Sequence, residues 1–221
     1  MDDPAARPFE AVLFDFGGVF IDSPFPAFAA SSLELGLDAS RLMELTFGPL
    51  DEDTDHPWHR VERGELPILD ARKEIIALCQ AEDLEVDPFR LLARTMGAQT
   101  QARSPVVDCV HAIRSAGLKT GLLTNNALEI RERWRAVLPL ADLFDDVVDS
   151  SEVGVRKPDP AIYHLALERL GGVDASSAIF LDDLPGNVEA AEALGMRGIL
   201  VEPDPALALV ELRSLVLSSA G

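Results

Sequence analysis

Cysteine is scarce in this chain of 221 residues: Cys79 and Cys109 are its only two, and they stand far apart. Two cysteines without paired spacing provide neither a zinc ligand set nor a disulfide framework. Because nothing in the sequence calls for an oxidising compartment, we expect a cytoplasmic location.

Basic residues are also few, since 19 Lys and Arg stand against 38 Asp and Glu and give a formal net charge of −19. Recognition of a nucleic acid or an acidic membrane begins with a basic surface, so we expect neither partner. An acidic protein that takes a phosphate substrate must place positive charge beside the phosphate. A bound divalent cation would supply that charge.

Long apolar runs are missing, and no stretch approaches the length that spans a membrane. The first ten residues, MDDPAARPFE, lack the basic and apolar start of a secretory signal. Hydrophobic residues nevertheless make up 48% of the chain, enough for one substantial core with a small second lobe.

Short apolar segments that end in polar residues have the pattern of buried parallel strands. Helical patterns that begin near Pro105, Pro160 and Asn187 separate them, and these end at glycine. The alternation predicts an α/β fold with a doubly wound parallel sheet. The expected strands lie at residues 10–15, 118–126, 177–187 and 196–203, with a weaker one at 145–150.

Residues 23–103 interrupt this alternation with helical or irregular patterns such as LPILDARKEIIALCQAED. We interpret this segment as a helical cap inserted after the first strand. Residues 1–22 and 104–221 would then form the Rossmann-like core.

The ends of the predicted strands carry residues suited to phosphoryl chemistry, and such ends are where open parallel sheets bind ligands. Each residue alone has an ordinary explanation as a turn residue, a strand end, a surface lysine or a helix cap. Their joint occurrence in this order favours a catalytic site. The candidates are Asp15, Thr124 with Asn125, Lys157, and the pair Asp182 and Asp183.

Four motifs carry a specific resemblance: VLFDFGGVF, LLTN, RKPDP and FLDDLPGNVEAA. Together they resemble the haloacid dehalogenase (HAD) superfamily over essentially the whole chain. The DFGGV form is similar to a phosphatase subgroup related to the N-terminal domain of soluble epoxide hydrolase and to glucose-1-phosphate phosphatases. The resemblance implies a phosphomonoester hydrolase that works through an aspartyl-phosphate on Asp15.

The resemblance also implies a Mg²⁺ site, because a carboxylate can attack phosphorus only when its own negative charge and that of the phosphate are both neutralised. Its ligands would be Asp15, the backbone carbonyl of Gly17 and Asp183, with Asp182 beside it directly or through water. Thr124, the amide of Asn125 and Lys157 would hold the phosphoryl oxygens, and Lys157 would also restrain Asp15. Asn187 would support the site from behind or cap a helix.

Gly17 departs from the usual pattern, because phosphatases of this family carry an aspartate there that protonates the leaving group. The absence of this aspartate should lower the rate of hydrolysis by about 10²- to 10⁴-fold. We therefore expect substrates with good leaving groups, such as sugar 1-phosphates, acyl phosphates or aryl phosphates. His56 and His59 are the candidates to replace the missing acid, but a solvent-facing position or packing on Trp58 is the simpler expectation for both.

Two alternatives remain open at this point. A 2-haloacid dehalogenase would use the aspartate without a metal, but the acidic pair in FLDDLPGN and the glycine in DFGGV argue against it. A catalytically weak phospholigand-binding protein would keep the fold and the metal without turnover. A small phosphorylated metabolite is the expected partner of a true phosphatase.

Overall fold

The computed structural model describes residues 8–96 and 101–217. At its centre lies a five-stranded parallel sheet with the strand order β3-β2-β1-β4-β5. All of the predicted strands are present, including the weak one near residue 146, and the doubly wound α/β fold is confirmed. The strands are β1 (Ala11–Phe14), β2 (Lys119–Thr124), β3 (Asp146–Asp149), β4 (Ala178–Asp182) and β5 (Arg197–Leu200).

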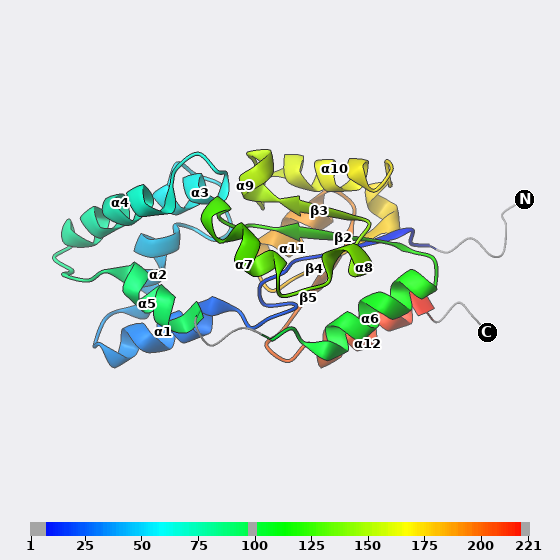
Figure 1. Cartoon of the computed structure of the whole chain (residues 1–221), viewed down its shortest axis with the longest axis horizontal. Helices are drawn as coiled ribbons and strands as arrows, with labels where there is room; N and C mark the ends of the chain where they lie inside the picture. Colours follow the sequence, from blue (N-terminus) through cyan, green and yellow to red (C-terminus); the bar gives the residue numbers. More distant parts are fainter. Residues whose placement is uncertain (1–7, 97–100, 218–221) are drawn as a thin grey trace, which may run out of the picture.

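Successive side chains of β1, β2, β3 and β4 enter two different hydrophobic cores, one on each face of the sheet. In β1, Val12 and Phe14 join the core beneath α6 (Ser104–Ser115) and α12 (Ala206–Leu217). Ala11 and Leu13 join the core beneath α10 (Pro160–Arg169) and α11 (Pro185–Ala193). Figure 1 shows α10 on one side of the sheet and α6 with α12 on the other. Both faces of the strands are therefore covered, which explains their nearly continuous apolar sequences.

Short elements complete the connections between the strands. The crossover from β2 to β3 runs through three of them, and one single-turn helix follows β3. They are η1 (Leu128–Ile130), α7 (Arg131–Arg135), α8 (Leu140–Leu143), α9 (Ser150–Val153) and η2 (Ala175–Ser177).

Five helices lie between β1 and α6, and the described residues of this segment contain no strand. They gather at one end of the sheet, away from the chain ends (Figure 1). Their core is built around Phe28, Leu42, Phe47 and Cys79, separate from the two cores of the sheet. The helices are α1 (Pro24–Glu34), α2 (Ala39–Phe47), α3 (Pro57–Glu62), α4 (Ile68–Gln80) and α5 (Pro88–Met96). In the described parts of the chain, no helix combines the length and apolar character needed to cross a membrane.

The strand register brings the predicted site residues to one edge of the sheet. Phe14 pairs with Leu122 on one side and with Leu181 on the other. The backbone N–H of Asp15 extends this pairing by donating to the carbonyl of Leu181 at 2.8 Å. Asp15 therefore begins the loop after the central strand, and β2 and β4 end beside it.

Candidate active site

Lys157 bridges two carboxylates at the edge of the sheet. Its ammonium lies 2.6 Å from Oδ1 of Asp15 and 2.6 Å from Oδ2 of Asp182. Only 1% of the Lys157 residue is exposed, and Asp182 is fully buried. Residues 142 and 25 positions apart in the sequence are thus joined around one buried cation.

The position of Lys157 is fixed through its backbone and through its ammonium group. The side chain of Asn125 accepts from the backbone N–H of Lys157 at 2.9 Å and donates to its carbonyl at 3.0 Å. The ammonium also lies 5.4 Å from the centre of the Phe180 ring, a cation–π distance. Asn125, expected as a phosphoryl contact through its amide, holds the lysine with its side chain.

The two aspartates that end β4 have different surroundings. Asp182 accepts three hydrogen bonds from the chain: its Oδ1 accepts from the backbone N–H of Leu184, and its Oδ2 accepts from Lys157 and from Asn187. Asp183 is only partly buried, and its carboxylate accepts a hydrogen bond from the side chain of Ser23. Asp183 therefore has more freedom to bind a ligand than Asp182.

Among the described residues, Asp15, Asp182 and Asp183 each offer a carboxylate oxygen within 4.8 Å of the others. Carboxylate oxygens are the ligands that Mg²⁺ and other hard cations prefer. With all three aspartates ionised, Lys157 balances only one of their charges. The remaining double negative charge matches a divalent cation, so the residues present fit the expected metal.

The loop after β1 is folded tightly against this cluster. Gly18 has a φ of +73°, and a Cβ at this position would lie 2.1 Å from Cγ of Asp183. Any side chain here would displace Asp183, which explains the glycine. Gly17 has room beside it, because its nearest neighbour would be Oδ2 of Asp15 at 3.9 Å from a Cβ. A Cβ at position 17 would therefore make only an ordinary van der Waals contact.

Burial and repulsion between carboxylates raise the pKa values of Asp15 and Asp183. For Asp15 burial is the main cause. The attraction of Lys157 lowers its pKa, but repulsion from Asp182 and Asp183 offsets part of that effect, and the pKa reaches about 8. Burial and repulsion from Asp182 raise the pKa of Asp183 to about 6. The pKa of Lys157 is raised because the attraction of Asp15 and Asp182 exceeds the effect of burial. Such carboxylates hold protons readily until a cation replaces them.

Thr124 is the last residue of β2 and is 2% exposed. The side-chain amide of Asn126 lies 3.5 Å from its hydroxyl, at the limit of a hydrogen bond. Thr124 follows Leu122 and Leu123 toward the same edge of the sheet as Asp15, as the sequence predicts. Its contact with a phosphoryl group remains a prediction.

Helix α3 and the loop before it lie against the third and fourth motifs. Arg156, which is 3% exposed, donates from Nε to Glu62 at 2.7 Å and from Nη1 to the carbonyl of Glu52 at 2.9 Å. A Cβ at Gly186 would lie 2.9 Å from Cα of Asp51. The loop thus reaches both Arg156, next to Lys157, and the start of α11, close to Asp182.

His59 is fully buried, so the expectation of a solvent-facing position is wrong for this residue. Its Nδ1 accepts from the backbone N–H of Thr54 at 3.0 Å, which requires an unprotonated nitrogen. Burial, with the charge of Arg156 second, lowers its pKa to about 3. The ring of His56 lies 5.6 Å away, and burial lowers the pKa of His56 as well. A neutral, enclosed His59 is a structural residue and is unsuited to donate a proton near neutral pH.

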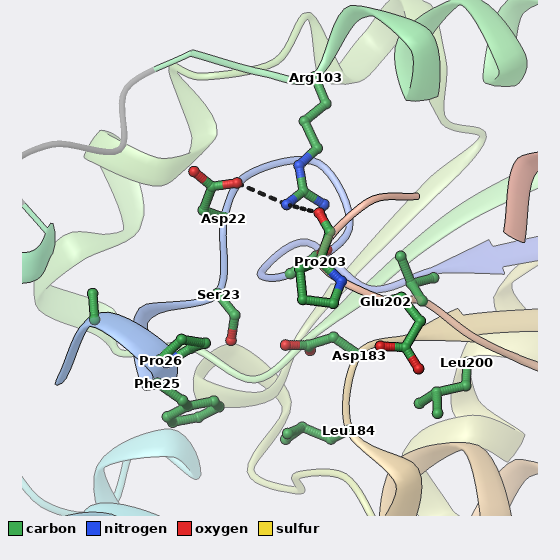
Figure 2. A pocket seen from close by; sticks show the side chains of 13 residues that line it. Asp22, Ser23, Phe25, Pro26, Arg103, Asp183, Leu184, Leu200, Glu202 and Pro203 are labelled. Atoms are coloured by element: carbon green, nitrogen blue, oxygen red, sulfur yellow. Dashed lines mark hydrogen bonds and ion pairs between the residues drawn. The ribbon is translucent and has the colours of Figure 1, made fainter. Parts of the chain in front are cut away.

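A cavity of about 580 Å³ opens beside Asp183. Figure 2 shows the Asp183 carboxylate directed toward Ser23, with Phe25 and Leu184 nearby. Most of its wall is apolar, while Arg103 stands at the far side with its guanidinium bonded to Asp22 and to the carbonyl of Pro203. The cavity joins the first loop, the start of α1 and the end of β5.

The parallel fold and its carboxylate–lysine centre define a hydrolase of a known class. The chain belongs to the haloacid dehalogenase-like hydrolase family, whose profile matches residues 9–195. The resemblance carried by the four motifs is thereby confirmed.

Characterised relatives cover this chain to different extents. The chain is 31% identical to the phosphorylated carbohydrates phosphatase of Thermotoga maritima over 94% of its own length and 93% of that protein. It is 33% identical to mouse acyl-CoA dehydrogenase family member 10 over 95% of its length, but only 19% of that protein is matched. A 57% share of the chain is 33% identical to rat bifunctional epoxide hydrolase 2, of which it matches 23%. The chain thus spans about a fifth of the two mammalian relatives.

Solved structures share the fold. A HAD family enzyme from Bacteroides thetaiotaomicron, in complex with magnesium and inorganic phosphate, has a TM-score of 0.59 and 19% identity and covers 89% of this chain and 96% of its own. A dehalogenase with an intermediate complex has a TM-score of 0.64 and 20% identity and covers 96% of this chain and 98% of its own. At these identities the likeness supports the architecture alone.

Three residues near the centre escape prediction from the sequence. Ser23 forms a hydrogen bond with Asp183, Arg103 donates to the carbonyl of Gly18 in the first loop, and Arg156 donates to Glu62 in the inserted segment. Arg156 carries one signal, since it precedes Lys157 within RKPDP. Ser23 and Arg103 lie at the two junctions of the inserted segment, where the sequence has no pattern that reveals their partners.

Proposed function

We propose that this protein is a Mg²⁺-dependent phosphomonoester hydrolase that acts on a small phosphorylated metabolite. The observation that carries the proposal is the buried ammonium of Lys157 at 2.6 Å from both Asp15 and Asp182, with Asp183 in the same cluster. A carboxylate nucleophile, a cation that restrains it and a group of hard-metal ligands are the parts that phosphoryl transfer requires. The phosphatase relative that matches almost the whole chain supports the same chemistry.

One oxygen of Asp15 would attack phosphorus, form a P–O bond and break the bond between phosphorus and the leaving oxygen. Water would then cleave the aspartyl-phosphate, release inorganic phosphate and restore the carboxylate. Mg²⁺, held by Asp15, the carbonyl of Gly17 and Asp183, would neutralise phosphoryl charge. Lys157 would keep Asp15 aligned, while Thr124 would contact the phosphoryl oxygens. Asp182, which already accepts three hydrogen bonds from the chain, would lie beside the metal and act on it directly or through water.

The absence of a side chain at Gly17 supports a preference among substrates. No side chain of that residue can protonate the departing oxygen, and the burial of His59 removes one of the two histidine candidates. We therefore propose substrates whose leaving group departs with little protonation, such as a sugar 1-phosphate. Residues 23–103 would form the cap over the active site. The enzyme would act in the cytoplasm.

The test compares the wild-type protein with Asp15→Asn, which keeps the shape of the side chain but removes its nucleophilicity. With Mg²⁺, the wild type should hydrolyse p-nitrophenyl phosphate, and the variant should lose at least about 10³-fold of that rate. Chelation of the metal should abolish turnover as well. Chloride release from a 2-haloacid without metal would instead establish a dehalogenase. Ligand binding without turnover on sugar, acyl, aryl and alkyl phosphates would establish a binding protein.

A further inference from the structure

Arg103 joins the loop after β1 to the segment after β5 at the base of the inserted segment. Its Nη1 donates to the carbonyl of Gly18 at 2.7 Å, and its Nη2 donates to Asp22 at 2.7 Å and to the carbonyl of Pro203 at 2.9 Å. Its backbone N–H donates to the carbonyl of Phe20 at 2.7 Å. Figure 2 shows the guanidinium between Asp22 and Pro203.

These contacts make Arg103 unsuitable as a substrate anchor, although it lines the cavity beside Asp183. Both Nη atoms already face oxygens of the chain, and only 16% of the side chain is exposed. A phosphate would have to displace the loop to reach the guanidinium. The role of Arg103 must therefore be exerted through the loop that it holds.

That loop sets the geometry of the cation site. Gly18, whose carbonyl Arg103 binds, lies against Asp183 so closely that a Cβ could not be accommodated. Gly17, the preceding residue, offers the carbonyl that the proposed metal site uses. A shift at Gly18 would thus move Asp183 and the Gly17 carbonyl together.

Asp22 adds the connection to the inserted segment. The chain enters this segment just after Asp22 and returns from it at Arg103, so their ion pair of 2.7 Å joins the two crossings. A change in the orientation of the inserted helices would act on Arg103 and, through it, on Gly18.

We propose that Arg103 is a positioning residue that couples the two crossings of the inserted segment to the cation site. The inference rests on the proposed function, because it assigns Arg103 a part in Mg²⁺ binding. Partners behind metal ligands are typically worth about 10- to 100-fold in metal affinity. Loss of the guanidinium should therefore weaken Mg²⁺ binding without removing any ligand.

The experiment measures Mg²⁺ binding to the metal-free full chain by titration calorimetry, without substrate. Arg103→Met should raise the dissociation constant for Mg²⁺ about 10-fold or more. Arg103→Lys keeps the positive charge but not the several N–H donors of the guanidinium, so its dissociation constant should lie between those of Arg103→Met and the wild type. The backbone amides of residues 16–23 should exchange hydrogen fastest in Arg103→Met, more slowly in Arg103→Lys and most slowly in the wild type. Arg197→Met is the matched control, since this arginine pairs with Glu211 on the surface and should leave the constant within about twofold.

A folded Arg103→Met that binds Mg²⁺ within about twofold of the wild type would overturn the inference, even if its melting temperature fell. If Arg103→Met does not fold, the same criterion applies to Arg103→Lys. A wild type that binds no Mg²⁺, or an Asp15→Asn variant with full activity, would instead refute the proposed function. The two failures are thus distinguishable.

Discussion

Replacement of Lys157 by methionine tests the charge balance of the site. Methionine preserves most of the buried stem but leaves Asp15 and Asp182 without their shared ammonium, which lies 2.6 Å from each. Removal of one partner from a buried ion pair costs about 3–5 kcal/mol. We expect Lys157→Met to lose that much of its free energy of unfolding in metal-free buffer.

The pH dependence of this loss has a definite sign. The pKa of Asp15 is about 8 with Lys157 present, and removal of the ammonium must raise it further. Between these two values the native variant holds a proton that the native wild type has released. The variant therefore loses more stability as the pH rises, and the difference from the wild type should be larger at pH 9 than at pH 6.

Urea unfolding measured with EDTA present, followed by the fluorescence of the buried Trp134, gives the comparison. With a slope of about 2–3 kcal/mol per molar urea, the midpoint should fall by about 1–2 M. Lys119→Met is the control, since its ammonium binds the carbonyl of Leu170 at an exposed strand end and its loss should cost about 1 kcal/mol. A Lys157→Met midpoint equal to that of the control, or a pH trend of opposite sign, would refute the charge balance.

Two further predictions concern the inserted segment. The pKa of His59 is lowered from 6.5 to about 3, so the native state loses stability as the pH falls below 6.5 toward 3, by up to about 1.4 kcal/mol per pH unit. In urea unfolding, the free energy of unfolding of His59→Gln should therefore fall less steeply with decreasing pH than that of the wild type. An unchanged pH dependence would contradict this. Arg156→Met removes the cation that pairs with Glu62, whose carboxylate keeps the hydrogen bond from the indole of Trp58, and should cost about 3 kcal/mol and raise KM more than it lowers kcat. The double variant Arg156→Met with Glu62→Met should recover part of the stability, and strictly additive losses would exclude the pairing.

The sheet was predictable because its cause is local. The strands are short apolar runs buried on both faces, and each ends where polar residues begin, as at Asp15 and Thr124. A parallel register then brings those ends together without further information. The meeting of Asp15, Lys157 and Asp182 follows from topology, which is why the order of motifs along the chain was sufficient to predict it.

The surroundings of the site were not predictable for the opposite reason. Arg103 binds Gly18 over a separation of 85 residues, and Arg156 binds Glu62 over 94. Neither pair leaves a periodic pattern, because each depends on how the inserted helices meet the sheet. His59 illustrates the same point: a histidine beside tryptophan in a polar segment gives no sign that it is fully buried.

The two arginines near the site clarify how an acidic protein can receive a phosphate. Arg103 is committed to backbone carbonyls and Asp22, and Arg156 to Glu62 and the carbonyl of Glu52. Lys157 is itself shared between two carboxylates. Because each of these cations already balances groups of the chain, little positive charge remains for the phosphoryl oxygens. In the proposed mechanism the divalent cation therefore carries most of the attraction for substrate, and the tight loop at Gly18 controls binding as well as catalysis.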